Sequence, residues 1–109
     1  MHRDEIPPGT LYMLILRTLA RGGEMHGYEI ANFIKKVSHD VLQVEEGSLY
    51  PALQRMLLKG WVSAEWGTTE GNRRARYYKL TAAGRKQLEA EVSQFERVVA
   101  AIVRVIQTA

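Results

Sequence analysis

The sequence predicts a mainly α-helical chain with a small β-hairpin, an α+β fold in one compact unit. Before residue 60 and again after residue 81, apolar residues recur every three or four positions, the period of amphipathic helices. Between these regions the period changes to two, as it does in strands. The length of 109 residues and the hydrophobic content of 46% suit a single domain with an adequate core.

Two helices are predicted in the first third of the chain. Residues 1–8 contain consecutive prolines and predict an arm without regular structure. A helix follows over residues 11–20, with Thr10 as a candidate N-cap. Because this helix is apolar on nearly all sides, it must be buried on more than one side. After a pair of glycines, a second helix is predicted from His26 to about Val37.

A third helix is predicted from Gly47 or Ser48, after a connector over residues 38–46. It is ended by Gly60 at the C′ position, where a left-handed backbone favours glycine. Its buried face shows helical spacing. That face consists of Leu49, Leu53, Met56 and Leu57.

Two strands complete the central part of the chain. Residues 61–66 and 76–80 are rich in β-forming residues, and residues 67–74 supply a long polar hairpin tip. The order helix, helix, helix, strand, strand is that of a winged helix-turn-helix domain. The hairpin aromatics are expected to fill its inner face. They are Trp61, Trp66, Tyr77 and Tyr78.

The last segment predicts one long helix with Thr81 as its N-cap. Apolar residues spaced alternately by four and three form a seam typical of helix pairing. The seam is Leu88, Val92, Phe95, Val99, Ile102 and Ile106. About 25 residues at 1.5 Å span about 40 Å, more than a small domain can cover. The helix therefore overhangs, and a second copy of the chain is expected to cover it, with Leu11 and Leu14 in the same interface.

These elements divide the chain into residues 1–80, a DNA-binding winged unit, and residues 81–109, a dimerisation helix. In the alternative arrangement, the last helix folds back on its own domain. Charge supports a polyanion as partner: residues 55–86 hold eight basic and two acidic residues. A solvated basic face is the alternative explanation for this excess. The predicted partners are double-stranded DNA and a second copy of the chain.

Candidate DNA-binding residues lie in the first turns of the third helix, which would enter the major groove. Ser48 lies where a helix N-terminus favours phosphate, unless it only caps the helix. Gln54 can pair with adenine, and Arg55 with guanine or phosphate. Tyr28 and Tyr50 can donate to backbone phosphates, with core packing an equal alternative for Tyr28.

The hairpin tip adds three candidate arginines, Arg73, Arg74 and Arg76. They suit phosphates or a narrow minor groove. Because side chains alternate along a strand, Arg74 and Arg76 share one face while Arg73 lies on the other. Arg73 and Arg74 are the preferred contacting pair.

Several function classes have little support in the sequence. There is no cysteine, and His2, His26 and His39 lack metal-ligand spacing. No nucleophile triad or phosphate-cradling glycine loop is present, so we expect no enzyme activity, no cofactor and no metal. The longest apolar runs, six residues each, are too short for a membrane span, and residues 1–9 lack the layout of a signal peptide. We expect a soluble cytoplasmic protein.

Several motifs together resemble one family of bacterial regulators. They are Gly9-Thr10-Leu11, His26-Gly27-Tyr28-Glu29-Ile30, Glu46-Gly47-Ser48-Leu49-Tyr50-Pro51-Ala52-Leu53, residues 74–80 and Thr81-Ala82-Ala83-Gly84. From about residue 6 to residue 88 the chain is similar to the PadR family of transcription regulators, in a compact form with a single short C-terminal helix. The resemblance implies a homodimeric repressor on a near-palindromic operator, released by a small apolar or aromatic effector.

An effector site in so short a chain would have to lie at the dimer interface. Its candidate lining is Met13 and Leu16 on the first helix with Phe95 and Val99 on the last. Phe95 as plain dimer core is the other interpretation. The alternative to the whole functional prediction is a winged-helix module that docks an acidic protein and does not bind DNA.

Overall fold

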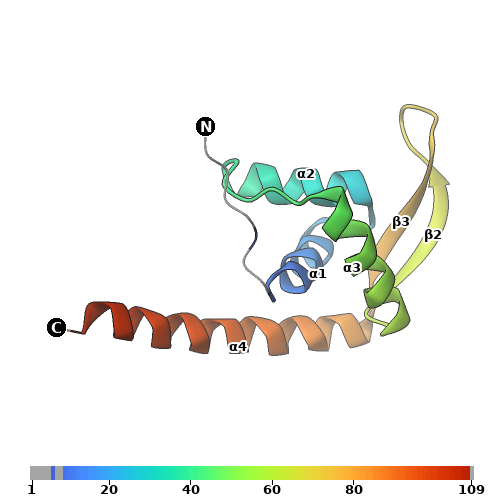
Figure 1. Ribbon diagram of the computed structural model, residues 1–109. Coiled ribbons are helices and arrows are strands. Elements are labelled where there is room, and N and C mark those ends of the chain that lie inside the picture. The colour runs from blue at the N-terminus through green and yellow to red at the C-terminus, as the bar shows by residue number, and fades with distance from the viewer. Residues whose placement is uncertain (1–5, 7–8, 109) are drawn as a thin grey trace.

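The structure is a computed structural model that describes residue 6 and residues 9–108. Its elements follow the predicted order with one added strand (Figure 1). They are α1 (Leu11–Gly22), β1 (Met25–His26), α2 (Gly27–Val37), α3 (Glu46–Leu58), β2 (Val62–Thr68), β3 (Arg74–Leu80) and α4 (Ala82–Gln107). The predicted α+β class is confirmed. Most of the predicted N-terminal arm, His2 included, lies outside the described residues.

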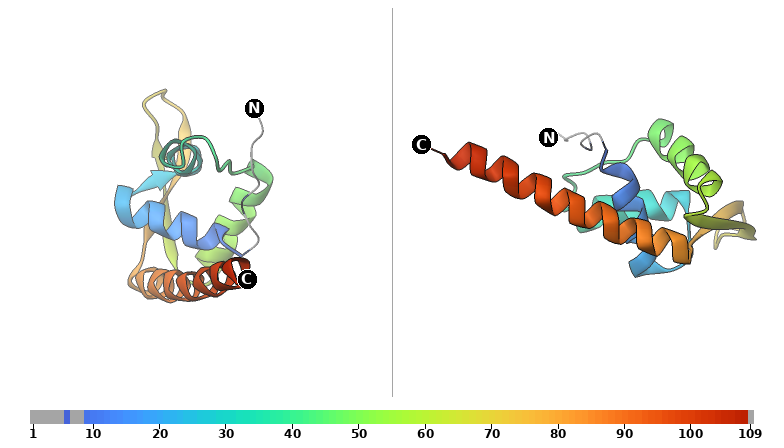
Figure 2. Two further views of the ribbon diagram at one scale, coloured as in Figure 1. Left: turned by 90° about the vertical axis from the view of Figure 1, so that its left-hand side faces the viewer. Right: turned by 90° about the horizontal axis from the view of Figure 1, so that it is seen from below.

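Helix α1 is the centre of the core, as its all-round apolar sequence predicts. It lies between α4 on one side and α2 and α3 on the other (Figures 1 and 2). Ile15 and Leu16 are fully buried, and Leu19 nearly so. Leu11 and Leu14 are half-buried against the same core. The other helices and the sheet are thus packed around one helix.

Helix α2 begins with a capping box formed by its own sequence. The amide of Glu29 donates to His26 Nδ1 (3.3 Å), and the amide of His26 donates to the Glu29 carboxylate (3.1 Å). Each side chain thereby satisfies a backbone donor that a helix start leaves free. His26 is therefore a helix-start residue, as its place in the sequence predicts.

Strand β1 was not predicted, and it makes the hairpin part of a three-stranded antiparallel sheet in the order β1-β3-β2. Met25 pairs with Tyr78 and His26 with Tyr77. Because His26 belongs to this strand and also caps α2, the sheet and the start of α2 are fixed to each other. The hairpin is therefore anchored along its base.

Helix α3 begins at Glu46, slightly before the predicted start, with Glu45 in the N-cap position. Ser48 lies within the first turn and is not the cap. Gly60 follows the helix with φ of 75°, which confirms its predicted role as the C′ residue. The buried face holds Leu49, Leu53 and Met56, as the spacing predicts.

Helix α4 begins at a tightly fixed junction with β3. The Thr81 hydroxyl accepts from the amide of Gly84 (3.0 Å) and donates to the carbonyl of Gly60 (2.6 Å). The Thr81 amide donates to the carbonyl of Trp61 (3.1 Å). Thr81 is thus the predicted N-cap, and it also holds the helix to the loop before β2.

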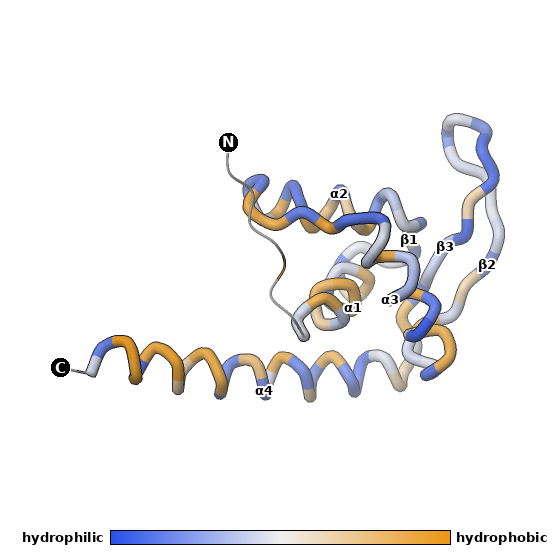
Figure 3. The backbone as a smooth tube through the Cα atoms, in the orientation of Figure 1, coloured by the Kyte–Doolittle hydropathy of each residue, from blue (hydrophilic) through white to orange (hydrophobic). Residues whose placement is uncertain are grey.

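The far half of α4 projects beyond the rest of the chain (Figure 1), which confirms the predicted overhang. From Ser93 to Thr108 every residue is exposed. The projecting apolar side chains include Phe95, Ile102 and Ile106, which are 41%, 51% and 74% exposed. In Figure 3 the hydrophobic colour is dense toward the free end of the helix. No helix among the described residues is long and apolar enough to span a bilayer.

Two residues assigned to the dimer interface or its pocket are packed inside one protomer. Leu88, predicted on the dimer seam, is 7% exposed because the first turns of α4 lie against the protomer's own core. Leu16, predicted to line an effector pocket, is 0% exposed between the other helices. In the protomer neither side chain belongs to the exposed apolar surface that a partner would cover.

Candidate nucleic-acid interface

The side of the sheet that faces the core changes character along its length. Near the core it carries Tyr78, paired with Ala64, and farther out it carries Arg76, paired with Trp66. Arg74 follows on the same side, since side chains alternate along a strand. The inner face is therefore apolar at the base of the hairpin and basic toward its tip.

Arg74 and Arg76 both lie over the ring of Trp66. Their guanidinium carbons are 4.5 Å and 5.9 Å from the ring centroid. The predicted sharing of one face by these two arginines is confirmed. The prediction that Trp66 fills the inner face as a packed residue is wrong, since its side chain is 60% exposed.

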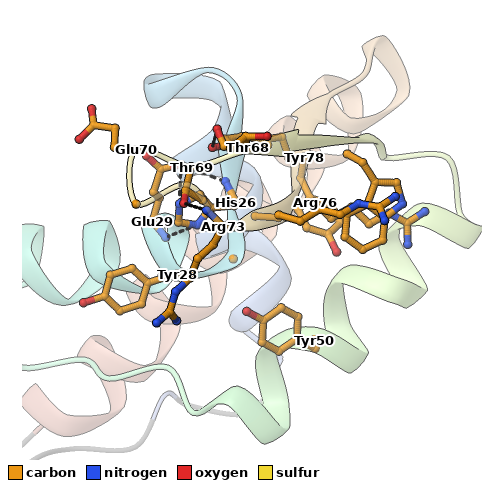
Figure 4. Close-up of a pocket in the computed structure, with 16 residues that line it drawn as sticks. His26, Tyr28, Glu29, Tyr50, Thr68, Thr69, Glu70, Arg73, Arg76 and Tyr78 are labelled. Atoms are coloured by element: carbon orange, nitrogen blue, oxygen red, sulfur yellow. Dashed lines mark hydrogen bonds and ion pairs between the residues drawn. The ribbon is translucent and has the colours of Figure 1, made fainter.

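Arg73 stands apart from this pair in the turn at the tip. Its amide donates to the Thr69 hydroxyl (3.2 Å), and its carbonyl accepts from the Thr69 amide (2.8 Å). Asn72 has φ of 60°, a left-handed value that asparagine tolerates better than most residues. The exposed Arg73 side chain extends from this turn in the direction of Tyr28 (Figure 4).

A cleft of about 1020 Å³ separates the hairpin from the helix starts. Its walls are the inner hairpin face, the first turn of α2 and Tyr50 of α3 (Figure 4). All three tip arginines line it, with Glu29 and Glu70 as the acidic residues. The cleft is thus a basic, aromatic-walled groove open to the surface.

Tyr50 and Tyr28 hold different positions on this wall. The Tyr50 ring packs on Gly27, where an added Cβ would lie 2.8 Å from the ring. Tyr28 is 70% exposed and stacks on His26 at 6.4 Å between ring centroids. Core packing, the alternative considered for Tyr28, is therefore excluded, and both phenols are available to a ligand in the cleft.

The candidate residues of α3 point in different directions. Gln54 is exposed on the side opposite the buried face. Arg55 lies about 100° farther around the helix, and its Nε donates to the Tyr12 hydroxyl of α1. Ser48 is exposed near the same flank as Arg55. Of these α3 residues Tyr50 lines the cleft, whereas Gln54 is exposed outside it and Arg55 is turned toward α1.

Burial controls the ionisation of the tyrosine at the inner end of the cleft. Desolvation raises the pKa of Tyr78 above its ordinary value. The nearby Arg76 charge opposes this shift, and Tyr50 adds to it. Tyr78 is therefore neutral at physiological pH. Because its phenol carries no negative charge, Tyr78 does not neutralise the positive charge of the arginines that line the cleft.

The four residues predicted for an effector pocket do not gather in the protomer. Met13 is 9% exposed and belongs with Leu16 to the core, whereas Phe95 and Val99 lie on the projecting part of α4. Among the described residues, no three histidine or acidic side chains gather closely enough to hold a metal ion.

The sequence matches a protein-family model and a relative of known sequence. The family model described as the transcriptional regulator PadR-like family matches residues 15–90. Uncharacterized protein X of Lysinibacillus sphaericus is 30% identical over 98 residues, which cover 90% of this chain and 89% of that protein.

Solved structures of regulators share the fold. A transcriptional regulator from Clostridium thermocellum is 26% identical, with a TM-score of 0.82, over 91% of this chain and 95% of its own. A PadR-like regulator from Bacillus cereus is 27% identical, with a TM-score of 0.76, over 93% and 95%. Bacillus subtilis PadR, solved with operator DNA, is 24% identical, with a TM-score of 0.68, over 79% and 48%. The last likeness shows the fold alone.

Proposed function

The chain belongs to the PadR-like family of transcriptional regulators, and from this premise we propose that it binds operator DNA as a homodimer in the cytoplasm. Members of such a family are regulators and not enzymes. The observation that carries the proposal is the cleft, which is lined by three hairpin arginines, by Tyr28 of α2 and by Tyr50 in the first turns of α3.

In this proposal, different residues in and beside the cleft contact the base edges and the phosphates of DNA. Gln54 and Tyr50 reach base edges and phosphates in the major groove from α3, while the hairpin arginines contact the adjacent backbone. Tyr28 donates to a phosphate from the start of α2. Ser48 adds a hydroxyl near the N-terminus of α3, where backbone donors favour an anion. Arg55 orients the helix through Tyr12.

The projecting part of α4 supports the homodimer. Residues 81–109 act as the dimerisation helix in this proposal, with residues 1–80 as the DNA-binding unit. The seam is Val92, Phe95, Val99, Ile102 and Ile106, with Leu11 and Leu14 of α1 beside it. Such a dimer places two α3 helices in successive major grooves about 34–36 Å apart, over a near-palindromic site.

Repression and effector release complete the proposal. A dimer that covers a promoter excludes the transcription machinery, and an apolar or aromatic effector wedged at the seam would change the angle between subunits. Phe95 and Val99 are the lining residues that the exposure of α4 supports. The dimer core is the competing role for Phe95.

Fluorescence anisotropy tests the function. The purified chain is titrated onto a labelled duplex from upstream of its own gene and onto a scrambled duplex, each at several salt concentrations. Preference for the upstream duplex, with an affinity that falls linearly in the logarithm of salt, is the expected result. If the chain binds neither duplex at low salt, the proposal fails, and the protein-docking module becomes the better explanation.

The double variant Arg74→Ala/Arg76→Ala is expected to make the salt dependence shallower. Each phosphate contact that is lost reduces the slope by about 0.9, because fewer counterions are released on binding. The control is Arg97→Ala/Arg104→Ala, which removes the same charge from the exposed part of α4. Equal slopes for the two double variants would contradict the assignment of the hairpin to DNA.

A further inference from the structure

Trp66 is a large aromatic residue exposed on the inner hairpin face where that face becomes basic toward the tip. It lies opposite Arg76 in the β2–β3 ladder and diagonally opposite Arg74, which pairs with Thr68. Both guanidinium groups lie within about 6 Å of its ring centroid, the range in which a cation is attracted to an aromatic face. The three side chains therefore form one stack, here called the Trp66 stack.

No hydrogen bond or ion pair in the described part of the chain holds these two arginine side chains. Neither forms an ion pair with a carboxylate there. The nearest acidic residue along β2, Glu65, pairs with Tyr77 and points to the opposite side of the sheet. The Nε atom of Arg76 is buried without a hydrogen-bond acceptor. The ring of Trp66 is thus the contact that the two guanidinium groups share.

Stacking on an aromatic ring leaves the N–H donors of a guanidinium group free to bind a ligand. The ring contacts the flat face of the group, whereas the N–H donors that bind phosphate radiate from its edge. An arginine held in this way keeps its terminal donors for a ligand. It also has less side-chain freedom to lose on binding, and ordering one such side chain costs about 0.5–1.5 kcal/mol.

We propose that Trp66 is a positioning residue that holds Arg74 and Arg76 ready for the DNA backbone before DNA arrives. This inference rests on the proposed function and assigns Trp66 no base or phosphate contact of its own. Its effect is on affinity through the arginines, and the charge of the hairpin is the same with or without the ring.

The location of Trp66 makes the residue suitable for mutation. Its side chain lies outside the cluster of buried residues that forms the core. Trp66→Leu keeps an apolar side chain and removes the aromatic face, so the free energy of unfolding is expected to change by about 0.5 kcal/mol or less. Trp66→Phe retains a smaller aromatic face and serves as the conservative rescue.

DNA titrations of these variants measure the proposed effect. Trp66→Leu is expected to weaken binding about 5- to 150-fold, with an unchanged salt slope, because two arginines must now be ordered on binding while their charges remain. Trp66→Phe is expected to recover most of the affinity. Unchanged affinity in Trp66→Leu would overturn the proposal.

Adding Trp66→Leu to Arg74→Ala/Arg76→Ala separates positioning from direct contact. In that background the Trp66 substitution is expected to cost nothing further, since no arginine remains to be positioned. An equal loss in both backgrounds would overturn the proposal and identify Trp66 as a DNA contact.

A measurement without DNA separates this inference from the proposed function. In the free protein, the side-chain protons of Arg74 and Arg76 are expected to show upfield ring-current shifts by NMR that disappear in Trp66→Leu. Absence of these shifts would overturn the Trp66 stack even if DNA binding is normal. Their presence in a protein that binds no DNA would leave the stack intact and disprove only the proposed function.

Discussion

The Val99→Asp variant is expected to be monomeric and to bind operator DNA about a hundredfold more weakly than the unchanged chain, or worse. Val99 lies in the middle of the apolar seam on the projecting part of α4, so each subunit of the proposed dimer would bury an aspartate against its partner. An unpaired buried charge costs several kcal/mol. A monomer also loses the gain from two linked half-site contacts, which is about 10² or more.

Ala101→Asp is the matched control for this experiment. Ala101 is also exposed on α4, but it is two residues away and therefore on nearly the opposite side of the helix. The Ala101→Asp variant carries the same added charge outside the seam and is expected to remain dimeric. Light scattering gives the mass, and circular dichroism shows that both variants are folded. A stable Val99→Asp dimer would disprove the seam.

Gly84→Ala is expected to lower the free energy of unfolding by about 2 kcal/mol or more. An added Cβ would lie 2.1 Å from the Trp61 carbonyl oxygen and 2.7 Å from Leu80 Cδ1, so the backbone at the β3–α4 junction must move. Overpacking of this kind costs about 1–3 kcal/mol and sometimes more. The better helix propensity of alanine returns about 1 kcal/mol at most.

The control here is Gly47→Ala in the first turn of α3. An added Cβ at Gly47 meets nothing within 4 Å, so only helix propensity changes, and stability is expected to rise by about 0.5–1 kcal/mol. Both variants are unfolded with urea at one fixed protein concentration, since the stability of a dimer depends on concentration. Equal stability of the two variants would disprove the close packing of Gly84.

The sequence predicts the main helices and the hairpin because each has a strong local signal. A run of apolar residues indicates α1, the apolar period defines α2 and α3, Gly60 ends α3, and Thr81 caps α4. Strand β1 could not be predicted, since two residues are too few to show a period and its pairing with β3 is a tertiary contact. The extension of β2 to Thr68 depends on the same long-range pairing.

For the candidate site, the sequence predicts which residue types take part but not how they are arranged in space. Residue type and spacing identify the tip arginines, Tyr50 and Gln54. They do not give the register between β2 and β3, so the pairing of Trp66 with Arg76 could not be read from the sequence. The turn of Arg55 toward Tyr12 is likewise a contact between distant segments.

The single residue between β3 and α4 has a mechanical consequence. Thr81 is held by three hydrogen bonds, so the backbone there cannot act as a free hinge. The hairpin and the long helix are therefore expected to move together as one rigid unit joined at Thr81. A tilt of α4 against a second subunit would displace the hairpin tip, so a rearrangement at the far end of the helix is transmitted to the cleft beside the hairpin.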